Sequence, residues 1–371
     1  MSKLQRACYL WLLLSLLVAI PTTASATLFS PVKPTKRTEA QLTNRLQRLD
    51  LPLPTTVTDA FTQRKIEDYL GPGGRNTERM LGRANLYFPV FEYYLVKHEL
   101  PASLKYLAVA ESMLVPGAVS SARAAGLWQL MPATAREMGL RVDGTVDERL
   151  DIHRSTEAAV LMLKALHEEF TDWNLVLAAY NAGGGRVRRA IRAAGSDTYE
   201  QVKAYLPGET QRYVAAYLAA AYAVNYYEDH GLIPHELPGT ESLRIYRRIS
   251  LAKLARECNI RPATLRRINP MFVQAYIPAS ATGYRLRVPA GRKSAVQRFL
   301  WGRPNLVELP ADENLELATT LAQERGFDPV RMLLGVRGDR LIYATPVWSF
   351  RQAQEQLLLD YLDDYRSFAS L

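Results

Sequence analysis

The stretch "AESMLVPGAVSSARAAGLWQLMP", residues 110–132, places a carboxylate at the end of an apolar helical pattern. Three apolar residues precede Glu111 at helical spacing, so Glu111 lies on their stripe and not on a solvated face: Leu104, Leu107 and Ala108. Removal of a carboxylate from water raises its pKa towards neutrality, which is the property that a general acid requires. This helix alone leaves open the alternative that Glu111 forms a structural ion pair.

The residues after Glu111 predict a cleft. Pro116 is expected to end the helix, and the small residues of "GAVSSARAAG" can line a cleft without filling it. The following "GLWQLMPATA" adds the amide of Gln129 and the apolar Trp128 and Met131. This mixture suits sugar rings, which have polar edges and apolar faces. Trp128 taken alone is better interpreted as a core residue.

The chain has 371 residues, enough for two or three domains. Its start, "MSKLQRACYLWLLLSLLVAIPTTASAT", has a basic region, an apolar run and a small-residue cleavage site, so we predict an export signal that is removed after Ala26. A retained anchor is the alternative, but the apolar run is shorter than the roughly 20 residues that span a bilayer. The mature chain then keeps only Cys258, which excludes internal disulfides. The net charge of +9 favours an acidic partner.

Composition and periodicity divide the chain into segments. The region of residues 59–230 follows helical spacing. A long helix is expected to begin near Asp151, and a shorter one has Asp172 as its expected N-cap and Gly183 as its stop. The tail is expected to hold two helices, "ENLELATTLAQERG" and "SFRQAQEQLLLDYLDDY", and a hairpin around Gly338 and Asp339. The predicted segments are a signal peptide (1–26), a flexible lead-in (27–58), a helical domain (59–230), a linker (231–242), a β-α-α-β module (243–290) and an α+β region of unassigned role (291–371).

Three ordered motifs resemble those of a known family. One run of this chain resembles, without a gap, the signature of the lytic transglycosylases with a goose-type lysozyme fold. It comprises Glu111, Ser112, Pro116, Ala118, Ser120, Ala125, "GLWQ", Pro132 and Thr134. The family elements "AYNAG" (179–183) and "ETQRYV" (209–214) follow in the same order. The stretch "RANLYFPVFEYYLVKHELPASLKYLAVAES" resembles the membrane-bound murein transglycosylase D branch. The resemblance covers residues 60–229, and Leu114 departs from the Phe that is frequent in the family.

The resemblance implies a mainly α, lysozyme-like catalytic domain that cleaves the MurNAc–GlcNAc β-1,4 bond of peptidoglycan. In such enzymes a single Glu acts as acid and then as base, and the product carries a 1,6-anhydro ring. Glu111 would have this role. By the same match Tyr213 would lie close to the carboxylate, Tyr180 and Asn181 would shape the cleft, and three residues would contact the substrate or Glu111: Ser120, Gln129 and Met131.

Other carboxylates offer no convincing second catalytic group. Asp143, Asp147 and Glu148 lie in the polar loop "RVDGTVDERLD" and are interpreted as solvated loop charges, whereas most glycosidases use two carboxylates. Two other functions stay open: a lysozyme-type hydrolase, and a non-catalytic scaffold that binds peptidoglycan.

The module of residues 243–290 is similar in layout to a degenerate LysM glycan-binding module, because the usual Gly-Asp turn after its first strand is replaced by "RRIS". A spacer role is the alternative. We expect no metal site, because the histidines lack ligand spacing, no cofactor and no nucleic-acid partner. The expected partner is the glycan strand, and the expected protein is a monomer in the periplasm of a Gram-negative bacterium. Whether it also associates peripherally with the outer membrane stays open.

Overall fold

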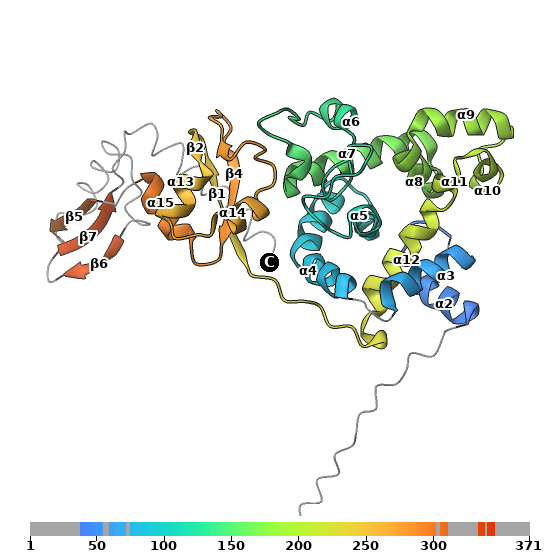
Figure 1. The fold of residues 1–371 in the computed structure, drawn as a ribbon, viewed down its shortest axis with the longest axis horizontal. Helices are drawn as coiled ribbons and strands as arrows, with labels where there is room; N and C mark the ends of the chain where they lie inside the picture. Colours follow the sequence, from blue (N-terminus) through green and yellow to red (C-terminus); the bar gives the residue numbers. More distant parts are fainter. Residues whose placement is uncertain are drawn as a thin grey trace, which may run out of the picture. The chain divides into compact units, whose positions relative to one another are not determined.

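The computed structural model describes residues 38–54, 59–71, 75–301, 305–310, 333–337 and 340–345, with side chains up to residue 300 (Figure 1). The predicted export signal and the two predicted tail helices lie outside these residues. Within the described ranges, no helix is both long and apolar enough to cross a membrane.

Residues 38–230 form a helical domain, as its spacing predicts. Its elements are α2 (Glu39–Gln47), α3 (Ala60–Leu70), α4 (Arg75–Lys97), η1 (Ala102–Lys105), α5 (Tyr106–Ser112), α6 (Pro132–Glu137), η2 (Glu148–Leu150), α7 (Ile152–Phe170), α8 (Trp173–Ala182), α9 (Gly184–Ala194), α10 (Tyr199–Val202), η3 (Lys203–Tyr205), α11 (Gly208–Gln211), α12 (Tyr213–Tyr226) and η4 (Glu228–His230). The carboxylate of Asp172 caps α8, as predicted, because it accepts a backbone N–H of the first turn. Asp151, near which α7 was expected to begin, caps that helix in the same way.

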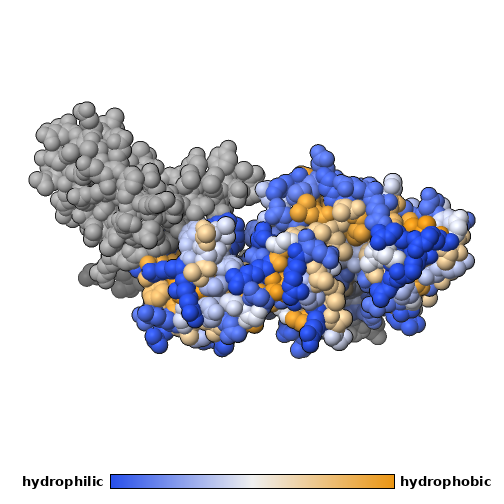
Figure 2. Space-filling view, turned by 90° about the horizontal axis from the view of Figure 1, so that it is seen from above, coloured by the Kyte–Doolittle hydropathy of each residue, from blue (hydrophilic) through white to orange (hydrophobic). Residues whose placement is uncertain are grey.

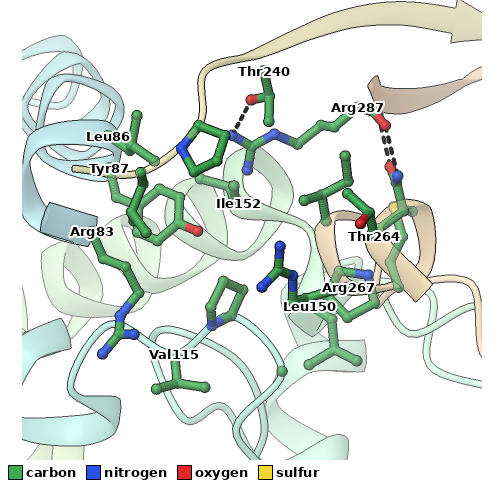
Figure 3. Close-up of a pocket in the computed structure, with 18 of the residues that line it drawn as sticks. Arg83, Leu86, Tyr87, Val115, Leu150, Ile152, Thr240, Thr264, Arg267 and Arg287 are labelled. Atoms are coloured by element: carbon green, nitrogen blue, oxygen red, sulfur yellow. Dashed lines mark hydrogen bonds between the residues drawn. The ribbon is translucent and has the colours of Figure 1, made fainter. Parts of the chain in front are cut away.

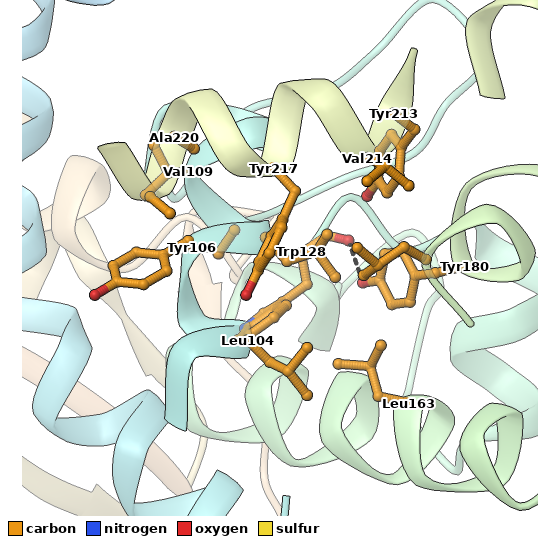
Figure 4. Close-up of a cluster of buried hydrophobic side chains, with 14 of the residues drawn as sticks. Leu104, Tyr106, Val109, Trp128, Leu163, Tyr180, Tyr213, Val214, Tyr217 and Ala220 are labelled. Atoms are coloured by element: carbon orange, nitrogen blue, oxygen red, sulfur yellow. Dashed lines mark hydrogen bonds between the residues drawn. The ribbon is translucent and has the colours of Figure 1, made fainter. Parts of the chain in front are cut away.

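The core of this domain is built around α12 and α5 (Figure 4). The Ala- and Tyr-rich α12 buries most of its length, and its Tyr217 and Tyr222 are fully enclosed. Trp128 is also fully buried, with its ring centroid 4.9 Å from that of Phe91 and its indole N–H donated to Thr156 Oγ1 over 2.9 Å. The interpretation of Trp128 as a core residue is therefore confirmed.

Two local features differ from the sequence predictions. Helix α2 lies within the predicted flexible lead-in, and Leu42 and Leu46 bury its apolar face in the core. Helix α5 ends at Ser112 and not at Pro116, because Met113 and Leu114 adopt left-handed φ values of 52° and 58°. The prediction for the end of this helix is wrong by four residues.

The predicted β-α-α-β layout is confirmed. Strand β1 (Thr240–Ile245) pairs antiparallel with β4 (Tyr284–Pro289), and α13 (Leu251–Glu257) and α14 (Pro262–Ile268) lie between them in the chain. The short strands β2 (Ile249–Ser250) and β3 (Tyr276–Ile277) form a second pair, and α15 (Lys293–Trp301) contributes to the same apolar core. Farther on, β5 (Asn305–Pro310), β6 (Leu333–Arg337) and β7 (Arg340–Thr345) form a sheet in the order β5-β7-β6. Its β6–β7 pair is the predicted hairpin.

The module and the helical domain share contacts. Val146, from the loop before α7, packs in the apolar core of the module. The backbone N–H of Asp147 donates to the carbonyl of Met271 over 2.9 Å, and Arg141 donates to the hydroxyl of Tyr284 over 2.7 Å. The exposed face of the described residues is mostly hydrophilic, with scattered apolar patches (Figure 2). Such patches are normal for a folded protein.

Candidate active site

Glu111 lies in the last turn of α5, directly before the left-handed residues that end the helix. Two side chains fix this end. The hydroxyl of Ser112 contacts the carbonyls of Ala108 and Leu127 at 3.0 and 2.9 Å, and Arg83 donates Nε and Nη2 to the carbonyl of Met113. These bonds attach the helix end to the "GLWQ" segment and to α4. The position of the Glu111 carboxylate is therefore set by three segments.

Burial raises the pKa of Glu111 to about 7. The hydroxyl of Tyr213 donates to Glu111 Oε1, which opposes this shift, and the nearby negative charge of Glu209 adds to it. Within the described part of the chain, no Lys, Arg or His forms an ion pair with Glu111. The alternative of a structural ion pair therefore has no support in this geometry. A partly exposed carboxyl with this pKa can both donate and accept a proton near neutral pH.

Two buried tyrosines, Tyr213 and Tyr180, lie near the Glu111 carboxylate; both are labelled in Figure 4. Tyr213 and Tyr180 are only 8% and 9% exposed, and burial followed by the charge of Glu111 raises the pKa of both well above the usual value. Both hydroxyls are therefore neutral donors at physiological pH. Tyr180 donates to the carbonyl of Trp128 over 2.7 Å. The family's second motif is thus bonded to the end of its first motif, beside Glu111.

The loop after α5 is closed by its own polar groups. Gln129 donates Nε2 to the carbonyls of Gly126 and Ala118 at 2.9 and 3.3 Å, and the hydroxyl of Ser120 accepts the backbone N–H of Ala124 at 3.0 Å. Gly126 has a φ of 84°, and a Cβ there would lie 1.9 Å from the carbonyl oxygen of Arg149. Only glycine fits that position. Ser120 and Gln129 therefore hold the loop in shape.

Met131 and Asn181 lie in different surroundings. Met131 is 44% exposed, whereas Asn181 accepts a hydrogen bond from the hydroxyl of Thr210 over 2.8 Å. Thr210 is buried and belongs to the "ETQRYV" motif, so this bond joins the second and third family elements. The sequence analysis did not single out Thr210, although the quoted motif contains it.

The interpretation of the loop carboxylates as solvated charges is wrong for Asp147. Asp147 is 9% exposed and binds Arg149 at both carboxylate oxygens, at 2.9 and 2.7 Å. Arg149 also donates to the carbonyls of Arg123 and Leu130 at 2.6 and 3.0 Å. This pair therefore braces the loop that follows Glu111. Sequence reasoning missed Arg149, whose partners become visible only in the fold.

The two neighbours of Asp147 also have partners. Asp143 accepts the N–H groups of Val146 and Thr145 and binds Arg141, which lowers its pKa to about 2. Glu148 accepts the backbone N–H of Arg141 over 2.7 Å. These acids are committed to the loop structure. No group of three or more His, Cys, Asp or Glu residues in the described ranges could hold a metal ion.

Two family models match parts of this chain. The family model "Transglycosylase SLT domain" matches residues 89–203, which include Glu111, the "GLWQ" segment and "AYNAG". Residues 89–203 are therefore similar to transglycosylase SLT domains. The model "Lytic transglycosylase MltD, LysM-like domain" matches residues 239–300, which contain the β-α-α-β module. The predicted fold class is confirmed: a mainly helical, lysozyme-like SLT domain is followed by a small α+β region.

Several proteins of known name are similar to parts of this chain. Membrane-bound lytic murein transglycosylase D of Escherichia coli is 34% identical over 212 residues, which are 54% of this chain and 46% of the relative. Peptidoglycan transglycosylase gp16 of Escherichia phage T7 is 41% identical over 86 residues, 23% of this chain and 6% of that protein. Among solved structures, the 70 kDa soluble lytic transglycosylase of Escherichia coli is 22% identical, with a TM-score of 0.35. The match covers 51% of this chain and 32% of that protein's chain. The family assignment rests on the sequence matches.

Proposed function

We propose that this protein is a peptidoglycan lytic transglycosylase that cleaves the β-1,4 bond between MurNAc and GlcNAc and leaves a 1,6-anhydro-MurNAc end. One observation carries the proposal: within an SLT domain, Glu111 has a pKa of about 7 and no cationic partner among the described residues. The names of two relatives, a murein and a peptidoglycan transglycosylase, support the substrate class.

In the first step, the protonated carboxyl of Glu111 donates its proton to the glycosidic oxygen. The C–O bond breaks, the GlcNAc hydroxyl leaves, and the acetamido group of the MurNAc residue assists at the anomeric carbon. Glu111 becomes a carboxylate in this step. The hydrogen bond from Tyr213 stabilises that anion, which offsets part of the cost of its burial.

In the second step, the Glu111 carboxylate removes the proton from the C6 hydroxyl of the same sugar. The C6 oxygen attacks the anomeric carbon as the acetamido oxygen leaves that carbon, the 1,6-anhydro ring closes, and Glu111 is protonated again. No water is consumed. We propose that Ser120, Gln129 and Met131 contact the sugars from the loop, and that Tyr180 and Asn181 shape the cleft from α8.

Product analysis tests this function. Purified sacculi are digested in water enriched in oxygen-18, and the released sugars are measured by mass spectrometry. A transglycosylase gives anhydro products without the label. Labelled products with free reducing ends would contradict the proposal.

One observation favours a second candidate, a lysozyme-type hydrolase. The exposed Glu209 lies close enough to Glu111 to raise its pKa, so it is available as a second carboxylate that could activate water. Under that function, Glu209→Gln would abolish the incorporation of the label. Under the proposed function, Glu209→Gln keeps anhydro products and slightly lowers the pKa of Glu111. The variant therefore separates the two reactions.

We propose that the protein acts in the periplasm as a monomer on glycan strands, with the LysM-like module as a glycan-binding unit. One relative is named a membrane-bound lytic murein transglycosylase, and this name supports an envelope location. Fractionation of cells into periplasm and membranes tests the location. Recovery of the protein in the cytoplasm would contradict it.

A further inference from the structure

A pocket of about 630 Å³ lies where the helical domain and the LysM-like module meet (Figure 3). This volume is within the range of small-ligand sites. Its walls come from α4, the loop after α5, the start of α7, residues 235–240, the end of α14, and β4. The apolar part of the lining includes Leu86, Tyr87 and Ile152.

The polar part of this pocket is strongly basic. Four arginines line it: Arg83, Arg267, Arg285 and Arg287. The lining has one carboxylate, Asp151, and its Oδ1 already accepts the backbone N–H of Arg154 at 2.8 Å as the cap of α7. His235 is the remaining group of the lining that can gain a positive charge. The excess of guanidinium groups favours an anionic ligand.

Among the described residues, three of these arginines form no ion pair with Asp151, the acid of the pocket: Arg83, Arg267 and Arg287. Arg83 donates to the carbonyl of Met113, and Arg287 donates to the hydroxyl of Thr240 over 2.7 Å. Arg267 forms no hydrogen bond or ion pair through its side chain within the described residues. Burial lowers the pKa of Arg83, so its charge is partly desolvated and an added anion would stabilise it.

The pocket adjoins the catalytic loop. Val115, Pro116 and Gly117 line it, and Val115 is four residues after Glu111, which limits the distance between their Cα atoms to about 15 Å. An extended peptide of four residues spans a similar length, about 13 to 14 Å. A peptide attached to a sugar beside Glu111 is therefore long enough to reach Val115, at the wall of the pocket.

We propose that this arginine pocket binds the carboxylates of the peptide that branches from the MurNAc residue of peptidoglycan. This inference rests on the proposed function, because it requires a MurNAc residue beside Glu111. Guanidinium groups bind carboxylates through paired hydrogen bonds, and Arg267 is available for such a pair. The apolar wall suits the short side chains of an alanine-containing peptide. The pocket would make the enzyme prefer strands that carry their peptides.

The test is a binding experiment with the full chain carrying Glu111→Gln, so that no ligand is consumed. Calorimetry compares GlcNAc–MurNAc with the same disaccharide carrying an acidic tetrapeptide. We expect the peptide to tighten binding about fivefold, which is the scale of an exposed ion pair, and Arg267→Glu to remove this advantage. Arg266→Glu is the matched control, because Arg266 is the exposed neighbour on α14 and does not line the pocket.

Three results would overturn the inference: equal affinity for both disaccharides, an unchanged peptide advantage in Arg267→Glu, or an equal loss in Arg266→Glu. Inorganic phosphate is added as a competitor. If it displaces the peptide-bearing ligand at equal concentration, the pocket is a general anion site and the peptide assignment is wrong. Thermal unfolding of both variants checks that they remain folded. Because binding is measured without turnover, a failure of the anhydro products would refute the proposed function and leave these results intact.

Discussion

Two sets of carboxylates in the helical domain have opposite surroundings. Glu111 is half-buried beside Tyr213, no described Lys, Arg or His forms an ion pair with it, and its pKa is raised to about 7. Asp143 binds Arg141 and two backbone N–H groups, and its pKa is lowered to about 2. Asp147 is as buried as the tyrosines around Glu111, but Arg149 neutralises it. Burial alone therefore does not make a catalytic acid. What distinguishes Glu111 from Asp143 and Asp147 is that, among the described residues, no cation pairs with it.

The largest effect that this comparison of carboxylates predicts is the loss of turnover in Glu111→Gln. Glu111→Gln removes the proton donor and acceptor, and we expect muropeptide release to fall at least about 1,000-fold, while binding of glycan strands is retained. The measurement is anhydro-sugar release from sacculi by mass spectrometry. Asp143→Asn is the control and should keep most of the activity. Turnover in Glu111→Gln within tenfold of the natural enzyme would remove Glu111 from its role.

The second largest effect concerns stability. Asp147→Asn leaves Arg149 buried without its counter-ion, so the free energy of unfolding should fall by about 3 kcal/mol. Urea denaturation measures this change. The equivalent change at the surface, Asp143→Asn, should cost far less, because that ion pair is exposed. A negligible loss in Asp147→Asn would show that the pair does not brace the loop.

The third effect has a pH dependence of known sign. The pKa of Glu111 is higher in the folded state than in the unfolded state, so the folded protein loses stability as pH rises from about 4.5 to about 7. Glutamine avoids this loss. Glu111→Gln should therefore be more stable than the natural protein by about 2 to 3 kcal/mol at pH 8 and equally stable at pH 4. A stability difference that does not vary with pH would contradict the raised pKa.

The smallest effect is expected at Tyr213. Its hydrogen bond lowers the pKa of Glu111, so Tyr213→Phe should raise that pKa further. Since the first step needs the protonated acid, kcat/KM falls as pH rises through the pKa of Glu111, and the variant should move this fall to higher pH by up to about one unit. A fall of kcat/KM with unchanged pH dependence would assign Tyr213 a packing role only.

Local sequence patterns predicted much of the fold and part of the site. Helical spacing placed Glu111 on an apolar stripe, the start of α7 near Asp151 was predictable, and the side chain of Asp172 was a recognisable cap. The end of α5 was not predictable, because Met113 and Leu114 are residue types that rarely adopt positive φ.

Contacts between distant segments were the other limit. Asp147 and Arg149 are two residues apart in sequence, but their role in the loop depends on the carbonyls of Arg123 and Leu130, which only the fold brings near. The arginine pocket likewise combines Arg83 with residues from β4 that are about 200 positions later. No periodicity connects such positions.

The most direct measurement is the titration of the Glu111 side-chain carboxyl by carbon-13 NMR in the full chain, assigned by comparison with Glu111→Gln. A single carboxyl that titrates at about 7 and moves upward in Tyr213→Phe is the predicted result. A carboxyl that titrates near the ordinary value of 4.5 would contradict the role of Glu111 as the acid and base of this site.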